Sequence, residues 1–139
     1  MSNCSYLVNG RPCEAAGTPY YNFAVCDEHK ASLEWLKRAT ALQAASQHPL
    51  EAFPGVCYIA LLPDGTVKIG YSNSDDLYHK RKQSLSREYG APVVELLKMP
   101  GGFVAEAMLH DRFKELRIPG PGERFNYSPD IAEFIAERR

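Results

Sequence analysis

The chain has 139 residues, of which 45% are hydrophobic and 24% are charged, and its formal net charge is −1. This composition excludes a disordered chain, and the length accommodates one domain of about 85 residues with a small appendage. The apolar runs fall short of the ~20 residues that a membrane helix needs, and the first twenty residues contain no apolar stretch of the signal-peptide kind. We therefore expect a cytoplasmic protein without a membrane partner.

The first thirty residues show no periodic pattern but hold three of the four cysteines. With one histidine, these cysteines have the spacing C-x8-C-x12-C-x2-H, formed by Cys4, Cys13, Cys26 and His29. Four such ligands are typical of a closed tetrahedral zinc site, and a reducing compartment argues against a disulfide framework. Scattered thiols without a metal are the alternative. We predict a zinc-binding module over residues 1–32, stabilised by its metal because few apolar residues could form a core.

Acidic and basic side chains balance in this module, so its charge identifies no partner. DNA, the rest of the chain and another protein all stay open as its docking partner. Residues 27–46 repeat apolar side chains at a spacing near 3.6, which predicts a helix, and residues 47–54 contain two prolines, which indicates a linker. We therefore divide the chain into the module at 1–32, a helix and linker at 33–54, and a second domain at 55–139.

The second domain shows alternating strand and helix patterns. Two β-rich runs joined by Pro63-Asp64-Gly65 predict a hairpin, and Ser74 and Gly90 are suitable caps for the helix that follows. The predicted elements are strands at 56–62, 66–71 and 93–99 and helices at 75–89, 103–117 and from 128 onward. The order β-β-α-β-α-α predicts an α+β fold, with a small three-stranded sheet flanked by helices.

Strand alternation divides the hairpin into two faces. Cys57 and Ile59 share the face that we expect to form the core, so Cys57 is interpreted as structural. Tyr58 and Lys68 share the other face with the small residues at 60 and 70, which leave space beside the phenol. The alternative for Tyr58 is an ordinary cross-strand aromatic contact.

The helix at 75–89 carries an arginine within an apolar stripe. Leu77, Arg81 and Leu85 are four residues apart and share one face. Arginine rarely points toward a core unless it is paired, and its planar fork suits a phosphate. Phosphate binding and a structural ion pair are equally compatible with this pattern. Residues 68–87 have a local excess of three positive charges, since five basic side chains stand against Asp75 and Asp76, but a solvated helix face explains this equally well.

The helix at 103–117 is predicted to carry Glu106, His110 and Arg117 in one stripe, bordered by Phe103 and Phe113. A lone carboxylate is too little for a protein-only magnesium cage. It is sufficient for Mg²⁺ that keeps several waters and takes its remaining ligands from a substrate phosphate. An exposed Glu-His pair on a solvated flank is the alternative.

Together these features resemble the GIY-YIG endonuclease superfamily, in particular its phage-associated branch that has KIG in place of YIG. The resemblance covers roughly residues 55–130 and fits the order of the predicted elements. It rests on Tyr58 in Gly55-Val56-Cys57-Tyr58-Ile59, the triplet Lys68-Ile69-Gly70, Arg81-x3-Leu85, Glu106-x2-Leu109-His110-x2-Phe113, and Arg117 followed by Gly122-Glu123-Arg124-Phe125.

The chain departs from the family pattern at a few positions. Lys68 replaces the second tyrosine, which is usual for this branch and leaves the identity of the general base open. Arg124 stands where the family has tryptophan. Asn126 is a candidate for the asparagine that the superfamily carries near its site.

The resemblance implies a small α/β sandwich that hydrolyses DNA phosphodiesters with one divalent ion, Mg²⁺ or Mn²⁺, and an association with phage or mobile elements. Tyr58 would help to deprotonate the attacking water, and its phenolate would form more easily beside Lys68, Arg81 or the metal. Glu106 would hold the metal, and His110 would position a water or carry a proton. Arg81 would brace the scissile phosphate. The other basic residues expected to bind substrate are Lys80, Lys82 and Arg117.

Two classes of function remain. The first is the endonuclease, with the zinc module assisting its docking. The second is a non-catalytic module that uses the same fold and a structural zinc to bind DNA or another protein, and the near-neutral charge favours it because nonspecific DNA affinity comes from neutralising phosphates. The set Tyr58, Lys68, Arg81 and Glu106 favours the enzyme, since a binder needs no metal-holding carboxylate beside a phosphate. An RNA-directed enzyme is a third possibility.

Overall fold

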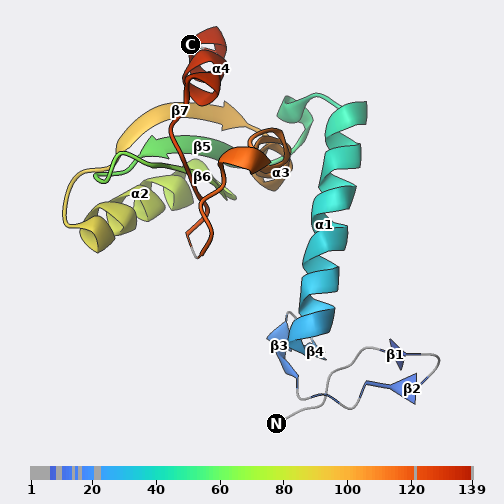
Figure 1. Ribbon diagram of the computed structural model, residues 1–139. Helices are drawn as coiled ribbons and strands as arrows, with labels where there is room; N and C mark the ends of the chain where they lie inside the picture. Colours follow the sequence, from blue (N-terminus) through green and yellow to red (C-terminus); the bar gives the residue numbers. More distant parts are fainter. Residues whose placement is uncertain are drawn as a thin grey trace. The chain divides into compact units, whose positions relative to one another are not determined.

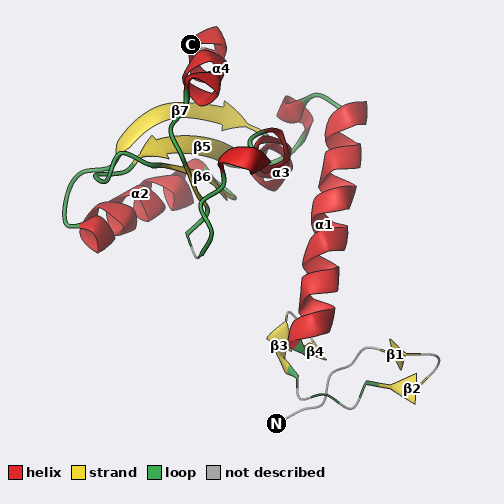
Figure 2. Cartoon of the chain, viewed as in Figure 1, coloured by secondary structure: helices red, strands yellow, loops and turns green. Residues whose placement is uncertain are grey.

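The computed structural model describes residues 7–8, 11–13, 15, 17–20, 23–120 and 122–138, and it has an α+β architecture (Figures 1 and 2). Its contacts divide the chain into two units, Met1–Thr40 and Ala41–Arg139, so the division falls within the segment predicted as helix and linker. None of the described helices is both long enough and apolar enough to cross a membrane.

The first unit contains two short antiparallel strand pairs that the sequence did not predict. Strand β1 (Leu7–Val8) pairs with β2 (Arg11–Pro12), and β3 (Thr18–Tyr20) pairs with β4 (Phe23–Val25). The helix α1 (Asp27–Gln47) begins directly after these strands, which confirms the helix predicted at 27–46. Asp27 and Glu28 lie in its first turn, where negative charge stabilises the exposed N–H groups.

The second unit is built on a four-stranded antiparallel sheet in the order β7-β5-β6-β8. Its strands are β5 (Val56–Leu61), β6 (Val67–Ser72), β7 (Val94–Pro100) and β8 (Arg124–Phe125). The helical segments are η1 (Leu50–Ala52), α2 (Asp75–Tyr89), α3 (Gly102–Arg112), η2 (Lys114–Leu116) and α4 (Pro129–Arg138). The prediction of three strands was wrong by one, because β8 has only two residues and forms through its pairing with Val67 and Lys68 rather than through a local pattern.

The caps predicted for α2 are confirmed. The hydroxyl of Ser74 accepts a hydrogen bond from the backbone N–H of Leu77 at 3.2 Å, which satisfies one of the free donors at the helix start. Gly90 ends the helix in the left-handed conformation, with φ of 67°. These caps fix α2 directly after β6, with Arg81 in its second turn.

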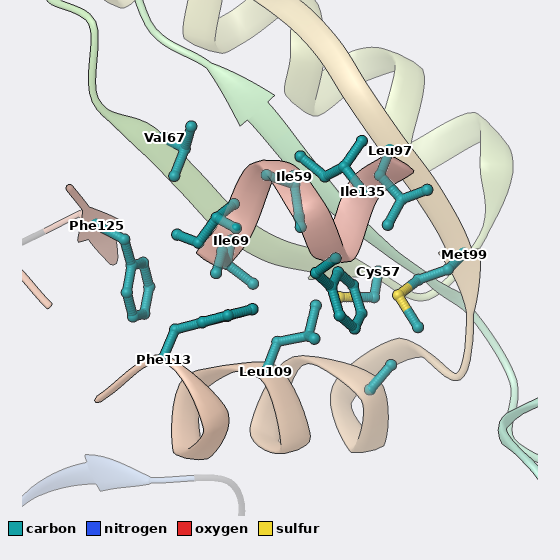
Figure 3. Close-up of a cluster of buried hydrophobic side chains, with 13 residues drawn as sticks. Cys57, Ile59, Val67, Ile69, Leu97, Met99, Leu109, Phe113, Phe125 and Ile135 are labelled. Carbon is teal, nitrogen blue, oxygen red and sulfur yellow. The ribbon is translucent and has the colours of Figure 1, made fainter. Parts of the chain in front are cut away.

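Both faces of the sheet are covered by helices. On one face Cys57, Ile59 and Ile69 pack against residues of α3 and α4, such as Leu109 and Ile135 (Figure 3). On the other face, Tyr58, Ala60 and Leu62 pack against Tyr78 and Leu85 of α2. The two faces predicted for the hairpin are therefore correct, but the Tyr58 face forms a second core and not an open surface.

The helix α3 is shorter than the sequence predicted. It ends at Arg112, and the chain continues through η2 so that Phe113 enters the core against Phe134, with 5.6 Å between the ring centroids. Arg117 consequently lies outside the helix, pairs with Phe125 through an isolated β-bridge and is exposed. The prediction that Arg117 shares a helical stripe with Glu106 and His110 was wrong, because packing of Phe113 ends the helix first.

Candidate active site at the edge of strand β6

The Tyr58 side chain occupies space that the glycine opposite it leaves open. Tyr58 of β5 pairs with Gly70 of β6, and a β-carbon at position 70 would lie 2.7 Å from the Tyr58 hydroxyl oxygen. The phenol is 2% exposed, and its ring packs on Tyr78 with 4.9 Å between centroids. The hydroxyl of Tyr78 donates a hydrogen bond to Glu95 on β7, which fixes the ring on which Tyr58 packs. The expectation that small residues make room for the phenol is confirmed at Gly70.

Burial controls the acidity of the Tyr58 phenol. It raises the pKa of Tyr58 to about 12, and the carboxylates of Glu123 and Glu106 act in the same direction. Arg81, which lies within hydrogen-bonding reach of the hydroxyl, lowers the pKa. The cation thus acts in the direction expected from the sequence, but its effect is smaller than that of burial.

Arg81 is exposed on α2 and does not interrupt a buried stripe. The buried residues of this helix are Tyr78 and Leu85, whereas Leu77 is 48% exposed, so the predicted stripe of Leu77, Arg81 and Leu85 was wrong. The row of α2 that packs on the sheet instead contains Tyr78 and Leu85, which contact Tyr58, Ala60 and Leu62. Among the described residues Arg81 forms no ion pair with a carboxylate, which argues against the structural alternative.

Lys68 of β6 is a buried cation whose pKa is affected by Arg81 and Glu106. It is 6% exposed, its Nζ donates to the carbonyl oxygen of Gly122 at 3.1 Å, and the same atom lies 3.7 Å from Glu123 Oε2. Burial lowers the pKa of Lys68, while the nearby Glu123 carboxylate opposes the change. The lysine of the Lys68-Ile69-Gly70 triplet therefore links β6 to the loop that precedes β8.

Glu106 and His110 lie one turn apart on α3 and are 1% and 8% exposed, so the alternative of a solvated pair is excluded. The Nε2 atom of His110 lies 2.9 Å from the carbonyl oxygen of Ile69. A carbonyl can only accept, so Nε2 carries the hydrogen, and in a neutral ring Nδ1 is then the acceptor. Phe125 packs edge-on to the imidazole, with 5.0 Å between centroids, and helps to fix the ring orientation.

Glu123 joins this pair, and the sequence did not identify it as a ligand. The ligand atoms of Glu106, His110 and Glu123 all lie within 4.8 Å of one another. Glu123 has a φ of 50°, the one positive value among the described residues other than glycine, and its carbonyl oxygen accepts from the N–H of Ile69 at 3.3 Å. The one feature of the sequence that could have identified Glu123 was its place in the Gly122–Phe125 motif. Its approach to α3 depends on a loop that no local pattern predicts.

The site thus lies where β6 is not covered by β8, because β8 pairs only with Val67 and Lys68 and the next residue, Ile69, bonds to His110 and Glu123. The structure brings together Tyr58, Lys68, Arg81, Glu106, His110 and Glu123. Arg81, Glu106 and Glu123 each affect the pKa values of Tyr58 and Lys68, and His110 lies beside the two glutamates. It does not place every expected residue in this group. Lys80 and Arg117 are exposed and, within the part of the chain that is described, form no hydrogen bond or ion pair with it.

Two further candidates lie beside the group. Lys82 is half-buried, with its Nζ 5.2 Å from the centroid of the Tyr78 ring. Asn126 is exposed and donates its backbone N–H to the carbonyl oxygen of Leu116. Neither side chain has a described contact with the six residues at the β6 edge.

A second group of metal-ligand type lies in the first unit. The Sγ atoms of Cys13 and Cys26 are 4.0 Å apart, and Cys26 Sγ is 3.3 Å from Nδ1 of His29. The distance between the two sulfur atoms is too long for a disulfide. Both separations lie close to the roughly 3.6–3.8 Å expected between ligands of one tetrahedral zinc ion. Cys4, the fourth predicted ligand, lies outside the described residues. Cys57 is fully buried in the core, where burial raises the pKa of its thiol, so it is structural as predicted.

Comparisons of the chain with protein-family models, with curated proteins and with solved structures found no match in any of the three.

Proposed function

We propose that the unit Ala41–Arg139 is a metal-dependent endonuclease that hydrolyses DNA phosphodiester bonds, with a fold of the GIY-YIG type. The observation that carries the proposal is the meeting of two chemically different groups at one edge of β6. Tyr58 and Arg81 approach from one face of the sheet, while Glu106 and His110 belong to the helix on the other face. Phosphodiester hydrolysis needs these functions: a base for the water, a cation for the phosphate and a ligand for a metal ion.

Arg81 supplies the phosphate contact. Its guanidinium is exposed and forms no carboxylate ion pair within the described residues, so its remaining donors can bind two oxygens of one phosphate. Lys80 and Lys82 flank it on α2 and add positive charge for the neighbouring phosphates. Arg117 is exposed and has no described bond with the site residues, and it would add positive charge for more distant phosphates. The substrate thus lies across the β6 edge.

Tyr58 takes the proton of the attacking water. With a pKa of about 12 the phenol is protonated at neutral pH, so the phenolate must be favoured by Arg81 and by the positive charge of a divalent ion. Glu106 would hold this ion, Mg²⁺ or Mn²⁺, and a bound ion would polarise the phosphate and stabilise the leaving oxygen. His110 positions a water or carries a proton, and the buried Lys68 adds positive charge beside Tyr58.

The first unit supports a second part of this proposal, a structural zinc ion. Cys13, Cys26 and His29 are the described ligands, and Cys4 is the proposed fourth. Two thiolates and one imidazole form a donor set that zinc prefers over Mg²⁺. The zinc module would serve docking on DNA or on another protein, and the resemblance to the phage-associated branch suggests a phage or mobile element as the setting.

The competing function is a non-catalytic module that binds DNA or a protein through the same surface. The net charge of −1 supports this alternative, because a nearly neutral protein has little of the nonspecific attraction for DNA that comes from neutralising phosphates. Burial of Glu106 argues against it, because a carboxylate that is 1% exposed contributes no contact to a binding surface. We therefore favour the endonuclease.

The decisive experiment measures cleavage of supercoiled plasmid and of high-complexity genomic DNA with Mg²⁺ or Mn²⁺, in the parent and in Tyr58→Phe and Glu106→Gln. Each variant removes one function with little change in shape, and we expect the cleavage rate to fall by at least about 100-fold in both. Tyr127→Phe and Glu115→Gln, at exposed positions, are the matched controls and should cleave like the parent. DNA binding without cleavage, equal in all variants and independent of the metal, would establish the binding module instead. Cleavage of RNA substrates in preference to DNA would assign the third possibility.

A further inference from the structure

Three potential ligands from two distant segments meet beside β6. Glu106 and His110 come from α3, Glu123 comes from the loop before β8, and their ligand atoms lie within 4.8 Å of one another. We propose that these three residues form a complete protein site for one divalent first-row transition ion, of which Mn²⁺ is the probe, and that the ion binds before DNA does. The inference rests on the proposed function and deepens it, because a lone Glu106 would need a phosphate from the substrate to hold an ion.

The tautomer of His110 is suitable for a metal ligand. Its Nε2–H is committed to the carbonyl oxygen of Ile69 at 2.9 Å, which leaves the lone pair of the neutral ring on Nδ1. Metal-binding histidines usually have this arrangement, in which one nitrogen donates to a carbonyl and the other binds the ion. The bond to Ile69 therefore sets the tautomer and the ring orientation before any ion arrives.

Glu123 is held in place by its backbone. Its φ of 50° is unfavourable for a residue with a side chain, and such conformations concentrate at functional sites. Two hydrogen bonds hold the loop against β6: Ile69 N–H donates to Glu123 O at 3.3 Å, and Lys68 Nζ donates to Gly122 O at 3.1 Å. These two bonds hold the loop where a carboxylate oxygen of Glu123 lies within 4.8 Å of the ligand atoms of Glu106 and His110.

The donor set selects the class of ion. Mg²⁺ prefers oxygen ligands and keeps most of its waters, whereas an imidazole combined with carboxylates suits the divalent first-row transition ions. Two carboxylates this close repel each other, and an ion between them turns the repulsion into attraction. Lys68, 3.7 Å from Glu123 Oε2, offsets only part of that repulsion, since it carries a single charge.

The test is a titration of the full chain, loaded with a single equivalent of zinc so that only the thiolate cluster is filled, with Mn²⁺ in the absence of DNA, followed by the EPR signal of free Mn²⁺. We expect one Mn²⁺ to bind per chain, at least about ten times more tightly than Mg²⁺ in competition. Glu123→Gln and His110→Gln should each weaken Mn²⁺ binding by about 10- to 100-fold, and Glu115→Gln should leave it unchanged. Electron spin-echo measurements on the bound Mn²⁺ of the parent should detect one directly coordinated imidazole nitrogen, a signal that needs no variant.

Two outcomes overturn the proposal: no Mn²⁺ binding without DNA, or Mn²⁺ binding that Glu123→Gln leaves unchanged with no coupled nitrogen in the parent. These results are separable from a failure of the endonuclease. Mn²⁺ bound by all three residues without cleavage of any nucleic acid keeps the metal site and removes the nuclease. Cleavage supported by Mg²⁺ and unaffected by Glu123→Gln keeps the nuclease and removes the three-ligand site.

Discussion

Tyr58 and Gly70 face each other across the β5–β6 pair so closely that a β-carbon at position 70 would lie 2.7 Å from the tyrosine hydroxyl oxygen and 2.8 Å from its ring carbon Cζ. The glycine of the Lys68-Ile69-Gly70 triplet is therefore required by the phenol that covers it. The pairing explains why a tyrosine on one strand and a glycine on the next belong to one motif. It also makes the position of the proposed base depend on the absence of a single methyl group.

Gly70→Ala should displace the Tyr58 ring. We expect cleavage to fall by more than about tenfold and the free energy of unfolding to fall by about 1–3 kcal/mol, as for an overpacked core. Urea unfolding and plasmid cleavage measure the two effects. In a Tyr58→Ala background the same substitution should cost little stability, because the ring that it strikes is gone. Equal costs in both backgrounds would contradict the contact.

The buried Tyr58 should make the protein sensitive to alkali. An unfolded tyrosine loses its proton near pH 10, whereas burial keeps Tyr58 protonated in the folded protein until about pH 12. Between these values the folded state binds more protons than the unfolded state, so the stability that the neutral phenol contributes is present below pH 10 and is lost as the pH rises. Urea unfolding from pH 8 to 11 should therefore show a smaller loss in Tyr58→Phe than in the parent.

Tyr78 adds to this effect, because burial and its bond to Glu95 also raise its pKa, so Tyr58→Phe should remove only part of the pH dependence. Tyr127→Phe, at an exposed tyrosine, is the matched control and should follow the parent. Identical pH profiles for Tyr58→Phe and the parent would show that Tyr58 is not protected from ionisation in solution.

Arg81 should matter for activity and little for stability. Its side chain is exposed, so we expect Arg81→Ala to change the free energy of unfolding by less than about 1 kcal/mol. Cleavage should fall by about 100-fold, because a cation at the phosphate is lost, and Arg81→Lys should restore only part of it, since an ammonium group cannot bind two oxygens in one plane. Arg87→Ala, at another exposed basic position of α2, is the control for net charge. A similar loss of cleavage in both alanine variants would assign Arg81 a general electrostatic role.

The N-terminal cluster should contain zinc. We expect the purified parent to carry one zinc ion per chain by elemental analysis and Cys26→Ser to lose it, because Cys26 is central to the three described ligands. Cys57→Ala is the matched control, since this cysteine lies in the core and should not affect the zinc content. Loss of zinc in Cys4→Ser would identify the fourth ligand. A parent without zinc after expression in zinc-containing medium would leave the cluster as ordinary thiols.

Much of the second unit follows from local patterns. The hairpin faces depend on strand alternation, and the boundaries of α2 depend on Ser74 and Gly90, so neighbouring residues determine both. The sequence also identified Glu106 and His110 as a pair, because residues four apart on a helix share a face. The cysteine spacing predicted the cluster of Cys13, Cys26 and His29 for a similar reason, since three ligands within a short segment have few ways to lie apart.

Only the tertiary structure decided how these parts complete one site. His110 reaches Ile69 across 41 residues, Lys68 reaches Gly122 across 54, and each of these bonds depends on how α3 and the loop before β8 pack on the sheet. The end of α3 at Arg112, the exposure of Arg81 and the approach of Glu123 are likewise results of packing. Local sequence sets the conformation of a segment through its own hydrogen bonds and side-chain periodicity. Contacts between distant segments are selected by the burial and shape of the whole core, which no window of the sequence contains.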